Sequence, residues 1–293
     1  MRLEHHVTQD EQGRRAVDVL LARTRMSRQL SKRIRLYGSL TCNGVPHRMI
    51  DPVSSGDHLV AFLPDQVSAK LEASAGIPII YQDDWLLIVD KPAGLVTHPT
   101  SFHRQDSLLT RLSSGHLHPI SRLDRDTSGL VLIGRNSHAH YLMSRTDIDK
   151  VYLTVVRGCP SPPSGVISQP IARAPGSIIE RRIDPEGDEA VTEYRVLRHF
   201  KAADCSLLQV RLMTGRTHQI RVHMQSIGHP LIGETLYGSS KVHPMDCLMS
   251  RQALHAFRLS FMHPIDHKTV SVVARPPDDF VQLLLFCRNA SAD

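Results

Sequence analysis

The first stretch of the 293-residue chain whose side chains could do chemistry is His118–Asn136, which gathers acids and cations around one aspartate. Asp124 and Asp126 alternate with Arg122 and Arg125, and an apolar run follows. A neighbouring guanidinium favours the ionised form of a carboxylate. This pattern predicts a charged carboxylate held beside cations at the edge of a hydrophobic core.

A second charged stretch, Thr214–Gly238, is predicted to form a helix over residues 217–227. Its cationic and imidazole side chains would lie near the helix N-terminus, which favours anions. They are Arg216, His218, Arg221 and His223. Composition alone favours a plainer interpretation, in which both stretches are structural salt-bridge clusters.

Several other chemistries lack their motifs. The sequence has no Cys-x-x-Cys pair and no His-Glu-x-x-His, so no dedicated zinc site is expected. It has no Walker A loop, no Gly-x-Gly-x-x-Gly fingerprint and no Gly-x-Ser-x-Gly elbow. We therefore expect ordinary side chains to do the chemistry, without a cofactor or a metal.

The elements that must position these residues read as an α+β domain with a mixed, mainly antiparallel sheet and a central cleft. Short apolar runs broken by turns recur through this part of the chain, and few helices separate them. The predicted strands cover about residues 77–81, 86–89, 130–133, 151–157, 190–197 and 206–212. We assign residues 79–293 to this domain and residues 65–78, which show no clear period, to a linker.

Residues 1–64 read as a separate α/β module with a helix between Ser27 and Gly38. Apolar residues at the i, i+4 and i+7 positions of that helix should face its core. They are Leu30, Ile34 and Tyr37. An Asn43–Gly44 turn then predicts a hairpin, and residues 58–62 a further strand.

Three cations of the same helix, Arg28, Lys32 and Arg35, repeat the apolar spacing two residues out of phase. They should therefore point away from the core. The chain has a net charge of +6, and residues 21–40 contain no acid. Such a face suits a phosphate backbone, although most charge runs are simply solvated. The phrases LSKRIRLYGSLTCNG and VSSGDHLVAF resemble the S-four-type RNA-binding domain, which favours RNA as the partner.

The larger part of the chain resembles the RluA-type pseudouridine synthases. The two charged stretches are similar to that family's signature motifs, and the likeness runs from about Ile79 to Pro277. Further matching phrases are IVDKPAGLVTHPT, KVYLTVVRG, EGDEAVTEYRVL and ALHAFRLSFMHP. The resemblance implies an enzyme that isomerises uridine to pseudouridine in RNA without a cofactor.

The resemblance also implies roles for particular residues. Asp124 matches the catalytic aspartate, Tyr152 the tyrosine that packs on the target base, and Arg221 the arginine that pairs with the aspartate. Arg122 matches an arginine that moves toward the space vacated by a flipped nucleotide. Ser121 stands where the family usually has histidine. We expect Asp124 and Arg221 to lie within hydrogen-bonding distance.

The expected partner is RNA, bound at the cleft by Arg122, Arg216 and His218. Large-subunit ribosomal RNA is the expected substrate, and transfer RNA is the alternative. A catalytically weakened RNA-binding or ribosome-assembly protein is a second alternative. No run of about 18 apolar residues occurs, so no membrane span is expected. The odd number of scattered cysteines, five, indicates a reducing cytoplasm, and a monomer is expected.

Overall fold

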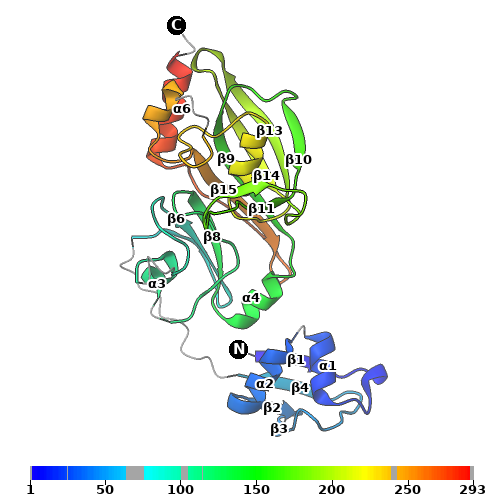
Figure 1. Ribbon diagram of the computed structural model, residues 1–293. Helices are drawn as coiled ribbons and strands as arrows, with labels where there is room; N and C mark the ends of the chain where they lie inside the picture. Colours follow the sequence, from blue (N-terminus) through cyan, green and yellow to red (C-terminus); the bar gives the residue numbers. More distant parts are fainter. Residues whose placement is uncertain are drawn as a thin grey trace.

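The structure is a computed structural model (Figure 1). It describes residues 2–24, 26–63, 76–99, 105–113, 115–238 and 243–290. The expected linker, residues 65–78, lies outside the described residues up to residue 75. None of the described helices is long and apolar enough to cross a membrane.

The N-terminal part forms a four-stranded antiparallel sheet with two helices, and its buried apolar residues form one cluster of their own, all between Leu3 and Leu63. The strand order is β1-β4-β2-β3. The elements are β1 (Arg2–His6), η1 (Gln9–Glu11), α1 (Ala16–Arg23), α2 (Arg28–Tyr37), β2 (Ser39–Cys42), β3 (Val45–Pro46) and β4 (His58–Phe62). The expected helix, hairpin and strand are confirmed.

Helix α2 begins and ends where the sequence predicts. The Ser27 hydroxyl accepts a hydrogen bond from the Leu30 amide at 3.0 Å, and Gly38 caps the other end. Leu30 and Ile34 are buried, as expected. The Tyr37 side chain lies outside the described residues. The three predicted surface cations of α2, which are Arg28, Lys32 and Arg35, are exposed.

The rest of the chain is built on a ten-stranded mixed sheet, which confirms the α+β class (Figure 1). Its main path runs β10-β13-β14-β9-β15-β8-β6-β5, while β16 pairs with β15 and β7 with β8. Strands β8 and β15 run parallel, and the other pairings in the described sheet are antiparallel. The strands are β5 (Ile79–Gln82), β6 (Leu86–Lys91), β7 (His118–Pro119), β8 (Ser128–Gly134), β9 (Ile148–Arg157), β10 (Ser164–Ser168), β13 (Val191–Phe200), β14 (Cys205–Leu212), β15 (Leu254–Met262) and β16 (Thr269–Val273).

Helices cover both faces of this sheet, which explains why strands such as β8 are continuously apolar. On one face, Val131 and Ile133 pack in a cluster with residues of α3 and α5. On the other, Leu130 and Leu132 pack with residues of α4, and α6 packs farther along the sheet. The remaining elements are α3 (Leu108–Leu112), α4 (Ser137–Met143), β11 (Ile171–Arg173), β12 (Arg181–Ile183), η2 (Lys201–Ala203), α5 (Gln219–Ser226), η3 (Pro244–Leu248) and α6 (Asp278–Ala290).

A close approach of β8 and β15 shapes the centre of the sheet. Gly129 has φ +112°, and a Cβ there would collide with the backbone of Ala256. Ala256 is paired with Gly129 on one side and with Tyr152 on the other. Two small residues therefore lie in register with Tyr152, and the segment that carries Asp124 enters β8 directly beside them.

Candidate active site

The segment between β7 and β8, residues 120–127, carries Asp124. Lys91, the last residue of β6, holds this segment in place. The Lys91 ammonium is fully buried and donates to the Arg125 carbonyl at 2.9 Å and to two carbonyls of the turn after β6. Burial lowers the pKa of Lys91 to about 7. These bonds fix the backbone next to Asp124 without placing the lysine in the site itself.

Other side chains hold the same segment from its remaining sides. The hydrogen bonds are Thr97 Oγ1 to the Leu123 carbonyl at 2.9 Å, Gln252 Nε2 to Thr127 Oγ1 at 3.1 Å and Arg251 Nη1 to the Asp126 carbonyl at 3.0 Å. A loop held by this many bonds presents its side chains in a fixed geometry.

Ser121 belongs to this fastening. Its hydroxyl accepts a hydrogen bond from the Leu132 amide of β8 at 2.8 Å, and the residue is 9% exposed. The Ser121 side chain therefore ties the Asp124 segment to the sheet. Ser121 also lines the cavity described below.

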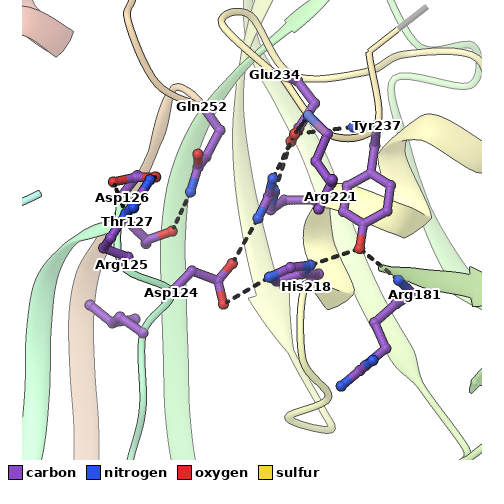
Figure 2. A network of polar contacts seen from close by, with 12 residues as sticks. Asp124, Arg125, Asp126, Thr127, Arg181, His218, Arg221, Glu234, Tyr237 and Gln252 are labelled. Atoms are coloured by element: carbon purple, nitrogen blue, oxygen red, sulfur yellow. Dashed lines mark hydrogen bonds and ion pairs between the residues drawn. The ribbon is translucent and has the colours of Figure 1, made fainter. Parts of the chain in front are cut away.

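The Asp124 carboxylate faces Arg221 of α5, as expected, but Glu234 binds that arginine more closely. Arg221 Nη1 lies 3.4 Å from Asp124 Oδ2, whereas Nε and Nη2 donate to the Glu234 carboxylate at 2.8 and 2.6 Å (Figure 2). Burial alone would raise the pKa of Glu234, but its bonds to Arg221 outweigh that effect and lower it. Glu234 thus anchors the guanidinium, which reaches Asp124 with its remaining nitrogen.

His218 faces the other oxygen of the same carboxylate. Its Nε2 lies 3.8 Å from Asp124 Oδ1, and its Nδ1 lies 2.7 Å from the Tyr237 hydroxyl (Figure 2). Arg221 and His218 therefore approach Asp124 from the same side of the site, with one nitrogen toward each oxygen. The Tyr237 ring also lies 5.1 Å beneath the Arg221 guanidinium carbon.

Tyr152 forms part of the wall beside Asp124 and is 7% exposed. Burial raises its pKa, and the charge of Asp124 acts in the same direction. The phenol therefore stays protonated at neutral pH. Such a side chain offers a packing surface rather than a phenolate base.

All the residues expected at the cleft line one cavity of about 380 Å³. They are Asp124, Tyr152, Arg221, Arg122, Arg216 and His218. The Arg122 side chain is exposed at this cavity, and Arg216 Nε donates to the Glu189 carbonyl at 2.9 Å. The three exposed cations of α2, which are Arg28, Lys32 and Arg35, do not line it.

One expectation about the second charged stretch was wrong. Helix α5 begins at Gln219, so Arg216 and His218 precede it, and His223 does not face an anion site. His223 is fully buried and hydrogen-bonded to Thr192 Oγ1 and the Gln169 carbonyl, at 2.8 and 2.9 Å. Two residues of helical advance turn a side chain by about 200°, so His223 and Arg221 point to opposite sides.

Sequence analysis missed three residues that organise the site, namely Lys91, Glu234 and Tyr237. A lysine that ends the apolar run LLIVDK was the available signal for the first, because a buried lysine must find partners. Glu234 and Tyr237 lie within the second charged stretch, Thr214–Gly238, but nothing in their spacing indicates a contact with Arg221. In the part of the chain that is described, no three His, Cys, Asp or Glu side chains cluster as metal ligands would.

Comparison with known proteins identifies the family. Residues 85–226 match the family model described as RNA pseudouridylate synthase. The chain is 35% identical to the ribosomal large subunit pseudouridine synthase D of Xylella fastidiosa, over 87% of this chain and 83% of that protein. It belongs to the RNA pseudouridine synthase family.

Other relatives support the assignment of this chain to the pseudouridine synthase family. An uncharacterized RNA pseudouridine synthase of Bacillus subtilis is 34% identical over 84% of this chain and 90% of that protein. The solved structure of human RNA pseudouridylate synthase domain containing 1 superposes with a TM-score of 0.59 at 27% identity, covering 74% of this chain and 89% of that one. The enzyme is thus an isomerase that converts uridine to pseudouridine within RNA.

Proposed function

We propose that this pseudouridine synthase modifies uridine in large-subunit ribosomal RNA and that Asp124 is its catalytic residue. The relatives from Xylella fastidiosa and Xanthomonas campestris are both named ribosomal large subunit pseudouridine synthase D, and the latter aligns over 99% of this chain. These names support ribosomal RNA as the substrate class.

The observation that carries the proposal is the placement of Asp124 in the cavity, between Tyr152 and the Arg221 nitrogen 3.4 Å away. The Asp124 side chain is 23% exposed, so it is accessible from the cavity. A volume of about 380 Å³ lies in the range of small-molecule sites. One flipped nucleoside, rather than a helix, is the form of RNA that such a cavity admits.

Two routes fit this geometry for breaking the bond between the anomeric carbon and the uracil nitrogen. The Asp124 carboxylate attacks the anomeric carbon, or it removes a proton from the sugar. The detached uracil then turns, and a ring carbon forms the new bond to the sugar. That carbon loses its proton, and the ring nitrogen that left the sugar takes one up, so the product is an isomer of uridine. Tyr152 packs on the base and the cavity walls retain it, which is consistent with a phenol that stays protonated.

We further propose that residues 1–64 are an S-four-type RNA-binding domain, joined by residues 65–78 to a catalytic domain of residues 79–293. The exposed cations of α2 are placed to contact phosphates, and the structure gives them no ion pair among the residues it describes. Arg122, Arg216 and His218 would contact the RNA near the target nucleotide. We also propose that the protein is a monomer in the cytoplasm, the compartment that its odd number of scattered cysteines favours.

The test is pseudouridine mapping of total RNA from cells with and without the protein, together with tritium release from uridine labelled at the ring carbon that rebonds. Loss of a site in large-subunit ribosomal RNA, and release from that transcript, are the expected results. Loss of a site confined to transfer RNA would identify transfer RNA, rather than ribosomal RNA, as the substrate. A wild type that is inactive on every RNA tested would favour an RNA-binding or assembly protein.

A further inference from the structure

A chain of two hydrogen bonds leads from the backbone of β12 through the Tyr237 hydroxyl to His218. The Arg181 amide donates to the Tyr237 hydroxyl at 2.8 Å, and that hydroxyl lies 2.7 Å from His218 Nδ1. The opposite ring nitrogen, Nε2, lies 3.8 Å from Asp124 Oδ1 (Figure 2). His218 thus faces the carboxylate oxygen that Arg221 does not face.

The first bond of this chain bears on where the imidazole proton sits. A backbone amide can only donate, so the Tyr237 oxygen accepts from Arg181, and its own hydrogen remains available for His218. When Tyr237 donates to Nδ1 of a neutral His218, the single ring proton resides on Nε2. The ring then points an N–H toward Asp124 rather than a lone pair.

The surroundings keep this ring neutral and fixed. Burial lowers the pKa of His218, while the nearby Asp124 carboxylate acts in the opposite direction. The other charged groups that face it are Arg221, Glu234 and Arg181. The His218 side chain is 11% exposed and meets the Tyr237 ring edge-on at 5.6 Å.

We propose that His218 is a positioning residue for Asp124, with its proton placed on Nε2 by Tyr237. This inference rests on the proposed catalytic role of Asp124. Arg221 and His218 then direct one N–H to each carboxylate oxygen, and these two directions define the orientation of the carboxylate. At 3.4 and 3.8 Å both contacts are long, so the carboxylate is directed without being clamped.

Two amide substitutions separate the two ring nitrogens. His218→Asn retains a group near Nδ1, facing Tyr237, but cannot reach Asp124. His218→Gln extends an N–H to about the position of Nε2. Residue 218 has φ +58°, a conformation that asparagine tolerates better than glutamine, so backbone strain works against the expected ranking. A higher activity of the glutamine variant would then reflect the Nε2 donor.

The expected result is a fall in kcat of about tenfold for His218→Asn, because Asp124 loses one of the two N–H groups directed at it, with KM within about twofold of wild type. His218→Gln should retain most of the activity. Initial rates of tritium release at several concentrations of ribosomal RNA transcript give both constants, and thermal unfolding checks that each variant folds. Equal activity of the two variants, or a change in KM alone, would overturn the proposal.

Tyr237→Phe tests the proton placement. This variant keeps the ring beneath Arg221 but frees His218 to put its proton on Nδ1. The deficit in kcat should be largest above the pKa of His218 and should shrink as the pH falls through that lowered pKa, because a doubly protonated imidazole regains its N–H at Nε2. A deficit of the same size at every pH would show that the hydroxyl is only structural.

Tyr194→Phe is the matched control. Its hydroxyl donates to the Pro162 carbonyl at 3.1 Å, outside the cavity, so its kcat and pH profile should equal those of wild type. The wild type and Asp124→Asn are measured alongside. An inactive wild type, or an active Asp124→Asn, would refute the proposed function itself. An active wild type with indistinguishable His218 variants would refute only the present inference.

Discussion

Three exposed cations of α2 and the buried Arg221 of the cavity differ in exposure and in pairing. Arg28, Lys32 and Arg35 are exposed, with no ion pair among the described residues, whereas the Arg221 side chain is 7% exposed and bound to two carboxylates. Exposed cations adapt to a phosphate backbone of any local shape, at the cost of salt screening. A buried, paired cation cannot adapt, and instead holds a fixed geometry.

Because exposed and buried cations differ in this way, the two regions should respond differently to substitution. Removing an exposed charge should change binding and its salt dependence while leaving the fold intact. Removing a buried partner should change the fold's stability or the chemical step. The following variants separate these outcomes, from the largest expected effect to the smallest.

Asp124→Asn keeps the shape of the side chain but removes its charge, and should reduce pseudouridine formation to below about 1% of wild type. An amide can neither attack the anomeric carbon nor accept the sugar proton, and proton transfer alone contributes about 10²–10⁴-fold. Tritium release measures the rate, and RNA binding should be nearly unchanged. Wild-type turnover in this variant would show that Asp124 is not the catalytic residue, and that the charges of the cavity do not serve the reaction.

Glu234→Gln should lower the free energy of unfolding by about 3 kcal/mol at neutral pH, because Arg221 is left without its buried countercharge. The pKa of Glu234 is lowered in the folded protein, so its contribution is present above its ordinary value of about 4.3 and is lost as the pH falls through the folded value. Urea unfolding of wild type and variant should therefore converge on acidification.

The control for this pair is Glu193→Gln, whose carboxylate lies 3.7 Å from Arg211 on the surface and is 41% exposed. An exposed ion pair contributes at most about 1 kcal/mol, so this variant should resemble wild type at every pH. Equal destabilisation by the two substitutions would contradict the distinction between buried and exposed pairs.

Replacing Arg28, Lys32 and Arg35 together by Ala should weaken RNA binding and reduce the salt dependence of log K by up to about one unit per lost contact. Binding titrations at several salt concentrations measure both. The matched control removes three exposed cations elsewhere, Arg195, Lys268 and Arg288. If both triple variants behave alike, α2 is no more than a solvated face.

Ser121→Ala should have the smallest catalytic effect, less than about threefold in kcat, because its hydroxyl binds the Leu132 amide rather than a reacting group. The free energy of unfolding should fall by about 1–2 kcal/mol, since a buried amide loses its acceptor. Chemical denaturation and tritium release give the two values. A large loss of kcat at unchanged stability would assign this position a role in the reaction.

Local patterns in the sequence were enough to predict the elements that carry these residues. Ser27 and Gly38 bound α2 because a cap hydroxyl and a glycine act on the nearest backbone groups. Strand β8 follows from its unbroken apolar run. The start of α5 was placed two residues early, and His223, expected near an anion-binding N-terminus, is buried instead.

The sequence by itself predicted several of the strands, the helix α2 with its exposed cations and, through its motifs, the likeness of Asp124, Tyr152 and Arg221 to a catalytic set. Only the tertiary structure decided which charges meet. Glu234 binds Arg221 from 13 positions away, and His218 contacts the Tyr237 hydroxyl, which accepts a hydrogen bond from the Arg181 amide of β12. Spacing along a helix or strand reports local neighbours, whereas these contacts depend on how the ends of separate elements converge on one cavity.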